Sequence, residues 1–144
     1  MVDPAELASI PLFDSLNDDD RRELSAWFDV KTVSEGVKLA SEGAAGYSFF
    51  VLVDGSAVVE SDGTVVATYA PGDFFGEMSI LEARPRSATV TTTSPSKLLE
   101  MFGTEFRRLQ QTHPAIADEL ERVTRELREE LLQLAREPNF PHAS

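Results

Sequence analysis

Residues 57–69 read A-V-V-E-S-D-G-T-V-V-A-T-Y, and this stretch decides the class of fold. Two runs rich in β-branched residues, Ala57–Glu60 and Val65–Tyr69, flank the dipeptide Asp62-Gly63. Asp-Gly between two such runs is typical of a two-residue turn that joins antiparallel strands. The stretch therefore predicts a β-hairpin.

Short apolar runs continue on both sides of the hairpin, from residue 31 to residue 102. Turn residues, mostly glycine or proline beside an acid or a serine, separate these runs. Many short strands at regular spacing favour a sandwich or barrel with antiparallel pairing. Besides the hairpin, the predicted strands are Val30–Val33, Val37–Ala40, Ser48–Val53, Ser87–Thr93 and Lys97–Phe102.

The segment before the strands, residues 4–30, has a helical pattern. Pro11 is expected to break the first helical segment, because proline disrupts a helix interior. Asn17 is expected to cap a second helix that runs through Leu24, Trp27 and Phe28.

The segment after the strands, residues 103–137, is also predicted to be helical. Thr104 is expected to cap a short helix that runs through Leu109, and Pro114 suits the first turn of a longer one. The longer helix carries apolar residues at intervals of three and four, which gives it one apolar face. These residues are Ile116, Leu120, Val123, Leu127, Leu131 and Leu134, and residues 138–144 follow as a tail.

The composition excludes several classes of function. The 144 residues suit one domain, 1–144, and the absence of cysteine excludes disulfides and makes a cytoplasmic location the expectation. The formal net charge of −12 repels nucleic acids, so none is expected as a partner. No segment resembles a signal peptide or is apolar enough to insert into a membrane. The same charge repels small anions, except where local hydrogen-bond donors overcome it.

Residues 73–90, D-F-F-G-E-M-S-I-L-E-A-R-P-R-S-A-T-V, bring such donors together. A helical turn that begins near Gly76 would present free N–H groups, which favour a negative charge. Arg86 adds a planar set of donors that suits phosphate oxygens. Glu77 is a poor phosphate partner, but its carboxylate can accept hydrogen bonds from a sugar hydroxyl. This combination fits a nucleotide whose phosphate and sugar lie close together.

The blocks F-G-E-M-S (75–79) and R-P-R-S-A-T-V (84–90) closely resemble the phosphate-binding cassette of cyclic nucleotide-binding domains. That family occurs in the catabolite activator protein, protein kinase A regulatory subunits and cyclic nucleotide-gated channels. The resemblance extends over residues 8–135 and implies an α+β, mainly β fold. We therefore expect an antiparallel β-roll or jelly-roll barrel over 31–102, with the cassette at 75–90, flanked by N-terminal helices over 1–30 and two C-terminal helices over 103–137.

The resemblance also implies roles for particular residues. Glu77 would bind the ribose 2′-hydroxyl and Arg86 the exocyclic phosphate oxygens. Threonine after the arginine often accompanies a preference for cGMP in this family, and Ser87 lacks its methyl group, so cAMP is favoured over cGMP. No cofactor beyond this ligand is expected. The full implied ligand-binding set is Gly76, Glu77, Met78, Ser79, Arg86, Ser87 and Ala88.

In the family, the helices after the barrel move onto the site and often cover the base. The resemblance thus makes the domain a sensor in which ligand binding repositions 103–137, with residues 101–103 as the expected hinge. The last helix offers no aromatic residue, so Arg125 or Arg128 is the expected base cap, through stacking of a guanidinium on the purine. Phe140 in the tail is an alternative.

Other interpretations stay open. Glu77 and Arg86 alone could form a surface ion pair without function. The domain could instead dock partner proteins through its last helix with little ligand binding, or form a homodimer through 114–134. A barrel enzyme that acts on a small acid is a third reading, but no nucleophile is paired with a base, so no catalysis is expected. His113 and His142 lie far apart in the sequence, so no metal site is expected. The sequence does not identify an effector.

Overall fold

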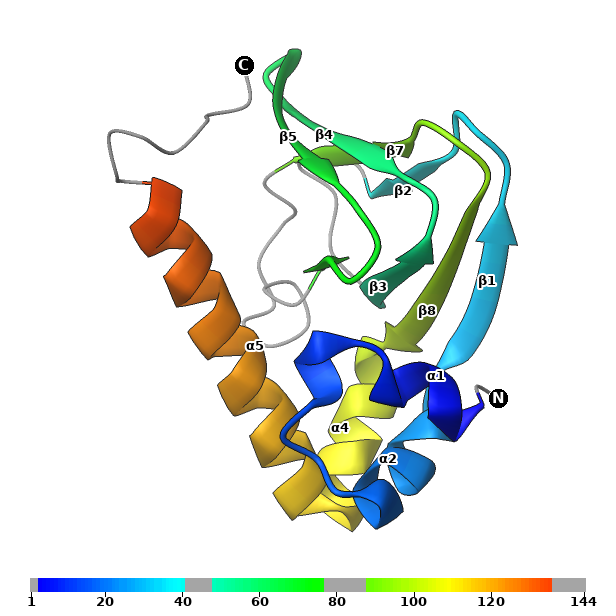
Figure 1. Cartoon of the computed structure of the whole chain (residues 1–144), viewed down its shortest axis with the longest axis vertical. Coiled ribbons are helices and arrows are strands. Elements are labelled where there is room, and N and C mark those ends of the chain that lie inside the picture. The colour runs from blue at the N-terminus through cyan, green and yellow to red at the C-terminus, as the bar shows by residue number, and fades with distance from the viewer. Residues whose placement is uncertain (1–2, 41–47, 77–87, 136–144) are drawn as a thin grey trace.

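The structure, a computed structural model, describes residues 3–40, 48–76 and 88–135, with side chains described as far as residue 126. Within these residues the strands form two four-stranded sheets in which every pairing is antiparallel (Figure 1). The first sheet has the order β1-β8-β3-β6, with bounds Asp29–Val33, Ser96–Phe102, Ser48–Asp54 and Phe74–Phe75. The second has the order β2-β7-β4-β5, with bounds Lys38–Ala40, Thr89–Thr92, Ala57–Ser61 and Thr64–Tyr69. The expected roll of antiparallel strands is confirmed.

The hairpin that decided the fold class is β4–β5, and its turn has the expected geometry. Ser61 lies opposite Thr64, so Asp62 and Gly63 form the two-residue loop. Their φ angles are 53° and 77°, as a type I′ turn requires. Asp62 is the sole non-glycine residue with positive φ in the described ranges, and aspartate tolerates that conformation better than most side chains.

The predicted strands agree with the observed ones to within about two residues at most ends, which is the usual uncertainty of strand limits. The strand predicted over Ser87–Thr93 is β7, although Ser87 lies outside the described residues. The sequence analysis missed β6, because two residues are too few to show any alternation. Phe75 of β6 lies opposite Phe50 of β3, and Phe74 lies opposite Val51.

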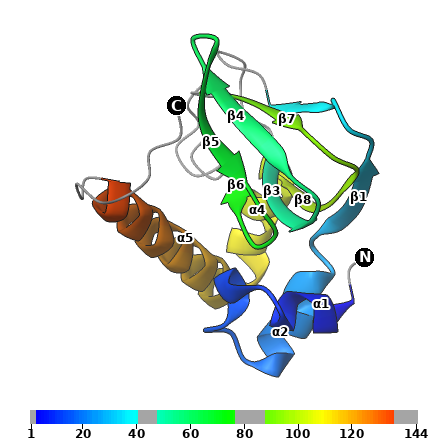
Figure 2. The ribbon, with the colours of Figure 1, turned by 45° about the horizontal axis from the view of Figure 1, so that its top comes forward.

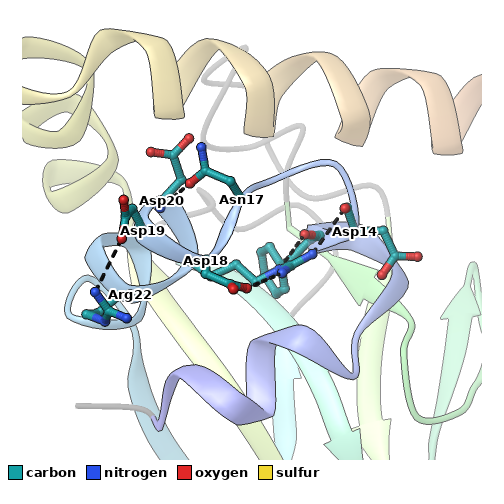
Figure 3. A network of polar contacts seen from close by, with 8 residues as sticks. Asp14, Asn17, Asp18, Asp19, Asp20 and Arg22 are labelled. Atoms are coloured by element: carbon teal, nitrogen blue, oxygen red, sulfur yellow. Dashed lines mark hydrogen bonds and ion pairs between the residues drawn. The ribbon is translucent and has the colours of Figure 1, made fainter.

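The N-terminal helices are α1 (Pro4–Ala8), a single 3-10 turn η1 (Pro11–Phe13) and α2 (Asp18–Ser25). Helix α1 ends at Ala8 and η1 begins at Pro11, so the predicted break at Pro11 is confirmed. The Asn17 carboxamide oxygen accepts the Asp20 N–H at 2.8 Å, so the predicted cap is confirmed (Figure 3). An ion pair between Arg22 and Asp19 at 3.3 Å lies on the exposed side of α2 (Figure 3).

The predicted extent of α2 was wrong, because Trp27 and Phe28 lie beyond the helix. The chain leaves α2 at Ala26 and enters β1 at Asp29. Phe28 is fully buried, with its ring 5.7 Å from that of Phe13 in an edge-on contact. Burial of this ring against both η1 and the sheet requires the helix to end before it.

The C-terminal helices are α4 (Gly103–Thr112) and α5 (Pro114–Ala135), the latter beginning at proline as predicted. The cap predicted at Thr104 was wrong, because α4 begins one residue earlier and directly continues β8. The Glu105 carboxylate accepts the Phe102 N–H at 3.2 Å, so an acid in the first turn replaces the hydroxyl cap. Neither α5 nor any other helix in the described part of the chain is long and apolar enough to cross a membrane.

Two hydrophobic cores lie on opposite faces of β3 and β8. Along β3, Phe49 and Val51 enter a core formed with the helices, while Phe50 and Leu52 enter a core between the two sheets. The helical core consists of Leu7, Ile10, Leu12, Phe13, Leu16, Leu24, Phe28, Phe49, Val51, Leu99, Met101, Phe106, Leu109, Ile116, Ala117 and Leu120. The roll core consists of Ala40, Phe50, Leu52, Ala57, Val59, Phe75, Val90 and Leu98.

Candidate ligand site

A tight turn leads the chain from β5 to the segment expected to bind the ligand. Within Ala70–Asp73, the Asp73 N–H donates to the Ala70 carbonyl at 3.0 Å, and the Asp73 carboxylate accepts the Ala70 N–H at 2.7 Å. Gly72 has a φ of 98°, so Pro71-Gly72 forms the centre of a type II turn, a conformation that favours glycine. The Gly72 N–H donates to the Leu52 carbonyl at 2.8 Å, which attaches the turn to β3.

Strand β6 follows this turn and contacts both cores. The Phe74 ring lies 6.0 Å from that of Phe49 and packs against the helical core. Phe75 is 4% exposed and belongs to the roll core. Because adjacent residues in a strand point to opposite faces, the last two residues before Gly76 touch both sides of the sheet.

Three aromatic rings stack beside the start of the ligand segment. The Phe75 ring contacts both Phe50 and Tyr69, with centroid distances of 5.1 Å to each. The planes are inclined by 26° and 12°, respectively, so both contacts are stacked. Phe50 and Phe75 come from the first sheet and Tyr69 from the second, so the stack bridges the sheets. The sequence analysis placed Tyr69 in a strand but did not foresee this contact, and the aromatic residue just before the Pro-Gly turn was the available signal.

The structure describes two of the seven predicted ligand-binding residues, one at each end of the segment. Gly76 has a φ of 86°, so its conformation is one that a side chain would strain. Ala88 packs against the roll core, just before β7. The predictions for Glu77, Met78, Ser79, Arg86 and Ser87 lie outside the described residues.

Of the two predicted base caps, the structure describes the side chain of Arg125. Its Nη2 donates to the Glu121 carboxylate on the preceding turn of α5 at 2.9 Å, and 46% of the side chain is exposed. Arg125 as a base cap stays a prediction, and stacking on a purine would have to keep or replace this ion pair. The Arg128 side chain and Phe140 lie outside the described residues.

The joint between α4 and α5 consists of a single residue, His113. Its N–H donates to the Leu109 carbonyl at 2.7 Å, and its own carbonyl accepts the Ile116 and Ala117 N–H groups at 3.1 Å each. Its imidazole Nε2 lies 3.1 Å from the Glu23 carboxylate of α2. The joint between the C-terminal helices is therefore attached to the N-terminal helices.

The beginning of α5 carries the clearest electrostatic perturbation. A hydrogen bond from Arg122 lowers the pKa of the Glu119 carboxyl, and a hydrogen bond from Ser15 contributes in the same direction. Arg122 also pairs with Glu126 one turn further along. In the described ranges no three His, Cys, Asp or Glu residues group in a way that could hold a metal ion.

These features define a class of protein. Two antiparallel sheets enclose a small core, and Gly76 and Ala88, the two described ends of the ligand segment, lie beside residues of that core. The helices gather on the other side of the shared strands (Figure 2). This is the architecture of a β-roll domain with helices on one side. The model of the cyclic nucleotide-binding domain family matches residues 30–113, from β1 to the α4–α5 joint. The chain belongs to the cyclic nucleotide-binding domain family.

Similar proteins and similar solved structures agree with this assignment. A cAMP-dependent protein kinase regulatory subunit from Eremothecium gossypii is 36% identical over 104 residues, which are 72% of this chain and 23% of that protein. The N-terminal domain of a Streptomyces coelicolor transcriptional regulator has a TM-score of 0.74 and 30% identity, over 87% of this chain and 94% of that one. A cAMP-bound PfPKA-R structure has a TM-score of 0.72 and 28% identity, over 94% of this chain and 47% of that one.

The chain spans only about a quarter of the length of the kinase regulatory subunit that it matches.

Proposed function

We propose that this domain is a cyclic nucleotide sensor that prefers cAMP and that converts binding into movement of α4 and α5. The observation that carries the proposal is the placement of Gly76 and Ala88. These two ends of the cassette-like segment both adjoin the roll core in a domain of this family. The kinase regulatory subunit and the cAMP-bound structure similar to this chain support cAMP as the ligand.

In this proposal, Arg86 binds the cyclic phosphate and Glu77 the ribose 2′-hydroxyl. A phosphate monoanion needs donors that overcome a net charge of −12, and a guanidinium supplies two parallel hydrogen bonds to such an anion. Gly76, Met78 and Ser79 contribute backbone groups, and Ser87 and Ala88 complete the phosphate cradle. A carboxylate beside the sugar accepts hydroxyl hydrogen bonds without competing for the phosphate.

The coupling to α4 and α5 would run through the strands that both cores share. Strand β6 contacts the roll core through Phe75 and the helical core through Phe74. Met101, at the end of β8, is fully buried in the helical core and precedes α4 by two residues. A ligand that shifts the segment after Gly76 therefore has a short packed path to the helices, with residues 101–103 as the hinge.

Titration calorimetry on the parent protein and on Arg86→Ala tests the phosphate assignment. Loss of the charged partner should weaken cAMP binding by about 2–4 kcal/mol. Arg84→Ala is the matched control, because it removes the same charge from the same segment, and it should bind like the parent. Binding by Arg86→Ala within about threefold of the parent, a difference below 1 kcal/mol, would refute the assignment.

Parallel titrations with cAMP and cGMP test the ligand preference. Tighter binding of cGMP would overturn it. A parent protein that binds neither nucleotide up to millimolar concentration would favour the alternative, a domain that docks partner proteins through α5. Sedimentation with and without cAMP tests the predicted homodimer through 114–134.

A further inference from the structure

We infer that Tyr69 is a positioning residue for the cyclic nucleotide, acting through Phe75 on the start of the ligand segment. This inference rests on the proposed function, since it concerns the same site. Tyr69 itself belongs to β5 of the second sheet, outside the segment that resembles the family's cassette.

The first step is that the Tyr69 ring stacks on the Phe75 ring. The Tyr69 and Phe75 rings are nearly parallel, inclined by 12° with centroids 5.1 Å apart. Phe50 also stacks on Phe75, with centroids 5.1 Å apart and planes inclined by 26°. A ring that stacks on two neighbours has little freedom about χ1 and χ2. Together with the pairing of Phe75 opposite Phe50, these contacts restrain the Phe75 residue.

The second step is the link from Phe75 to the ligand segment. Gly76 is the next residue, and its φ of 86° turns the chain away from the strand. Gly76 is the one residue between Phe75 and residue 77, so the direction in which the chain leaves β6 depends on the orientation of the Phe75 peptide. Loss of one stacking partner would therefore widen the range of directions at the start of the segment.

The third step is the other end of the segment. Ala88 and Tyr69 both pack against the roll core as half-buried residues. Val90, two residues after Ala88, is 4% exposed in the same core and lies opposite Val59 of β4. Both ends of the segment thus rest on one core, and Tyr69 stacks on the ring next to the first end. A well-positioned binding segment needs this kind of packed support.

The ring of Tyr69 should matter more to affinity than its hydroxyl. Tyr69→Phe keeps the stacked ring, whereas Tyr69→Leu removes it and keeps an apolar side chain. Val33→Ala is the control, because Val33 is also half-buried against the roll core but lies on β1, away from Gly76. All three variants would be measured by urea unfolding, by cAMP calorimetry and by hydrogen exchange of the amides at 76 and 88–92.

Tyr69→Phe should bind cAMP within about twofold of the parent, and Tyr69→Leu should bind about three- to tenfold more weakly, as the loss of one aromatic pair implies. Tyr69→Leu should also speed amide exchange at 76 and 88. Val33→Ala should lower the urea midpoint but leave the affinity and the exchange at these positions unchanged.

Each of three results would overturn the inference while the proposed function stands. Tyr69→Leu could bind cAMP as tightly as the parent, or Tyr69→Phe or Val33→Ala could lose as much cAMP affinity as Tyr69→Leu. If the parent protein binds neither cAMP nor cGMP, the proposed function fails. The hydrogen-exchange data then test separately whether Tyr69 restrains the segment. Faster exchange at 76 and 88 in Tyr69→Leu alone would still show that Tyr69 restrains the ends of the segment, and unchanged exchange would refute that restraint.

Discussion

The helical core and the roll core are built differently, although strands β3 and β8 contribute side chains to both. The helical core draws large side chains from helices at both ends of the chain, and it is closed by Phe13, Phe28 and Phe106. The roll core is smaller, includes Ala40 and Ala57, and is bordered by half-buried side chains such as Tyr69 and Ala88. The comparison indicates that the helical core contributes most of the stability, while the roll core supports the ligand segment at its edge.

The sharing of β3 and β8 by both cores affects the cooperativity of unfolding. Leu98 of β8 packs in the roll core, whereas its neighbour Leu99 packs in the helical core, and both are fully buried. A strand cannot lose one face of its packing and keep the other unchanged, because adjacent side chains share a backbone. We therefore expect the two cores to unfold together.

The largest effect is expected from damage to the helical core. Phe28→Ala should lower the free energy of unfolding by about 3–5 kcal/mol, because a fully buried ring is replaced by a cavity. Urea unfolding monitored by far-UV circular dichroism and by Trp27 fluorescence should still give coincident transitions. Val30→Ala is the control: this valine is 41% exposed two residues further on, so its removal should cost less than about 1 kcal/mol. Separate transitions in Phe28→Ala would show that the cores are independent.

A smaller loss of stability is expected from a substitution at the end of β3, one of the two strands that both cores share. Gly55 follows β3 with a φ of 101°, and a Cβ there would lie 2.7 Å from the Pro95 carbonyl oxygen and 2.8 Å from the Ser96 Cα. These are backbone atoms at the start of β8, which cannot move aside as a flexible side chain would. Gly55→Ala should therefore cost about 2–4 kcal/mol, from backbone strain and overpacking together.

Gly63 provides the matched control for Gly55. Its φ is 77°, but a Cβ at this position would meet nothing within 4 Å. Gly63→Ala should cost only about 1 kcal/mol, the conformational term alone. Equal losses of urea stability in the two variants would mean that the close approach of Gly55 to β8 contributes nothing.

The burial of β3 on both faces explains which features the sequence could predict. The β4–β5 hairpin was predictable because local turn chemistry fixes it, and β5 shows regular alternation of exposed and half-buried residues. The apolar run Phe49–Val53 shows no alternation because β3 is buried on both faces, so the existence of a second core could not be read from it. The end of α2 was wrong for a related reason, since tertiary burial of Phe28 overrides a helical pattern.

The candidate site was predictable only in part. The two cassette-like blocks identified the family, and glycine at 76 matches its positive φ. The stacking of Tyr69 on Phe75 could not be predicted, because it joins residues of different sheets and depends on strand order rather than on spacing. Likewise, the attachment of His113 to Glu23 links positions 90 residues apart, which no local pattern reveals.

The smallest effect is expected at the edge of the helical core, where α5 begins. The Arg122 guanidinium lowers the pKa of Glu119 below its ordinary value of 4.5, so the folded protein favours the ionised carboxylate. A carboxylate of this kind stabilises the fold fully above the unfolded-state pKa, and the contribution is lost as pH falls through the lower folded-state pKa. Glu119→Gln should therefore reduce stability at pH 7, and this loss should shrink as pH falls below 4.5 and vanish below the lower folded-state pKa.

The size of this effect is limited by solvent. The side chains of Glu119 and Arg122 are 30% and 51% exposed, so screening should keep the loss at pH 7 below about 1 kcal/mol. Urea midpoints of Glu119→Gln and the parent between pH 3 and pH 7 measure it, with Glu35→Gln as the control for removing one exposed negative charge. A difference that grows as the pH falls would contradict the assignment, because protonation would then strengthen an interaction that depends on the ionised carboxylate. A difference well above 1 kcal/mol would instead place this pair among the packed contacts of the helical core and weaken the contrast between a buried core and its solvated edge.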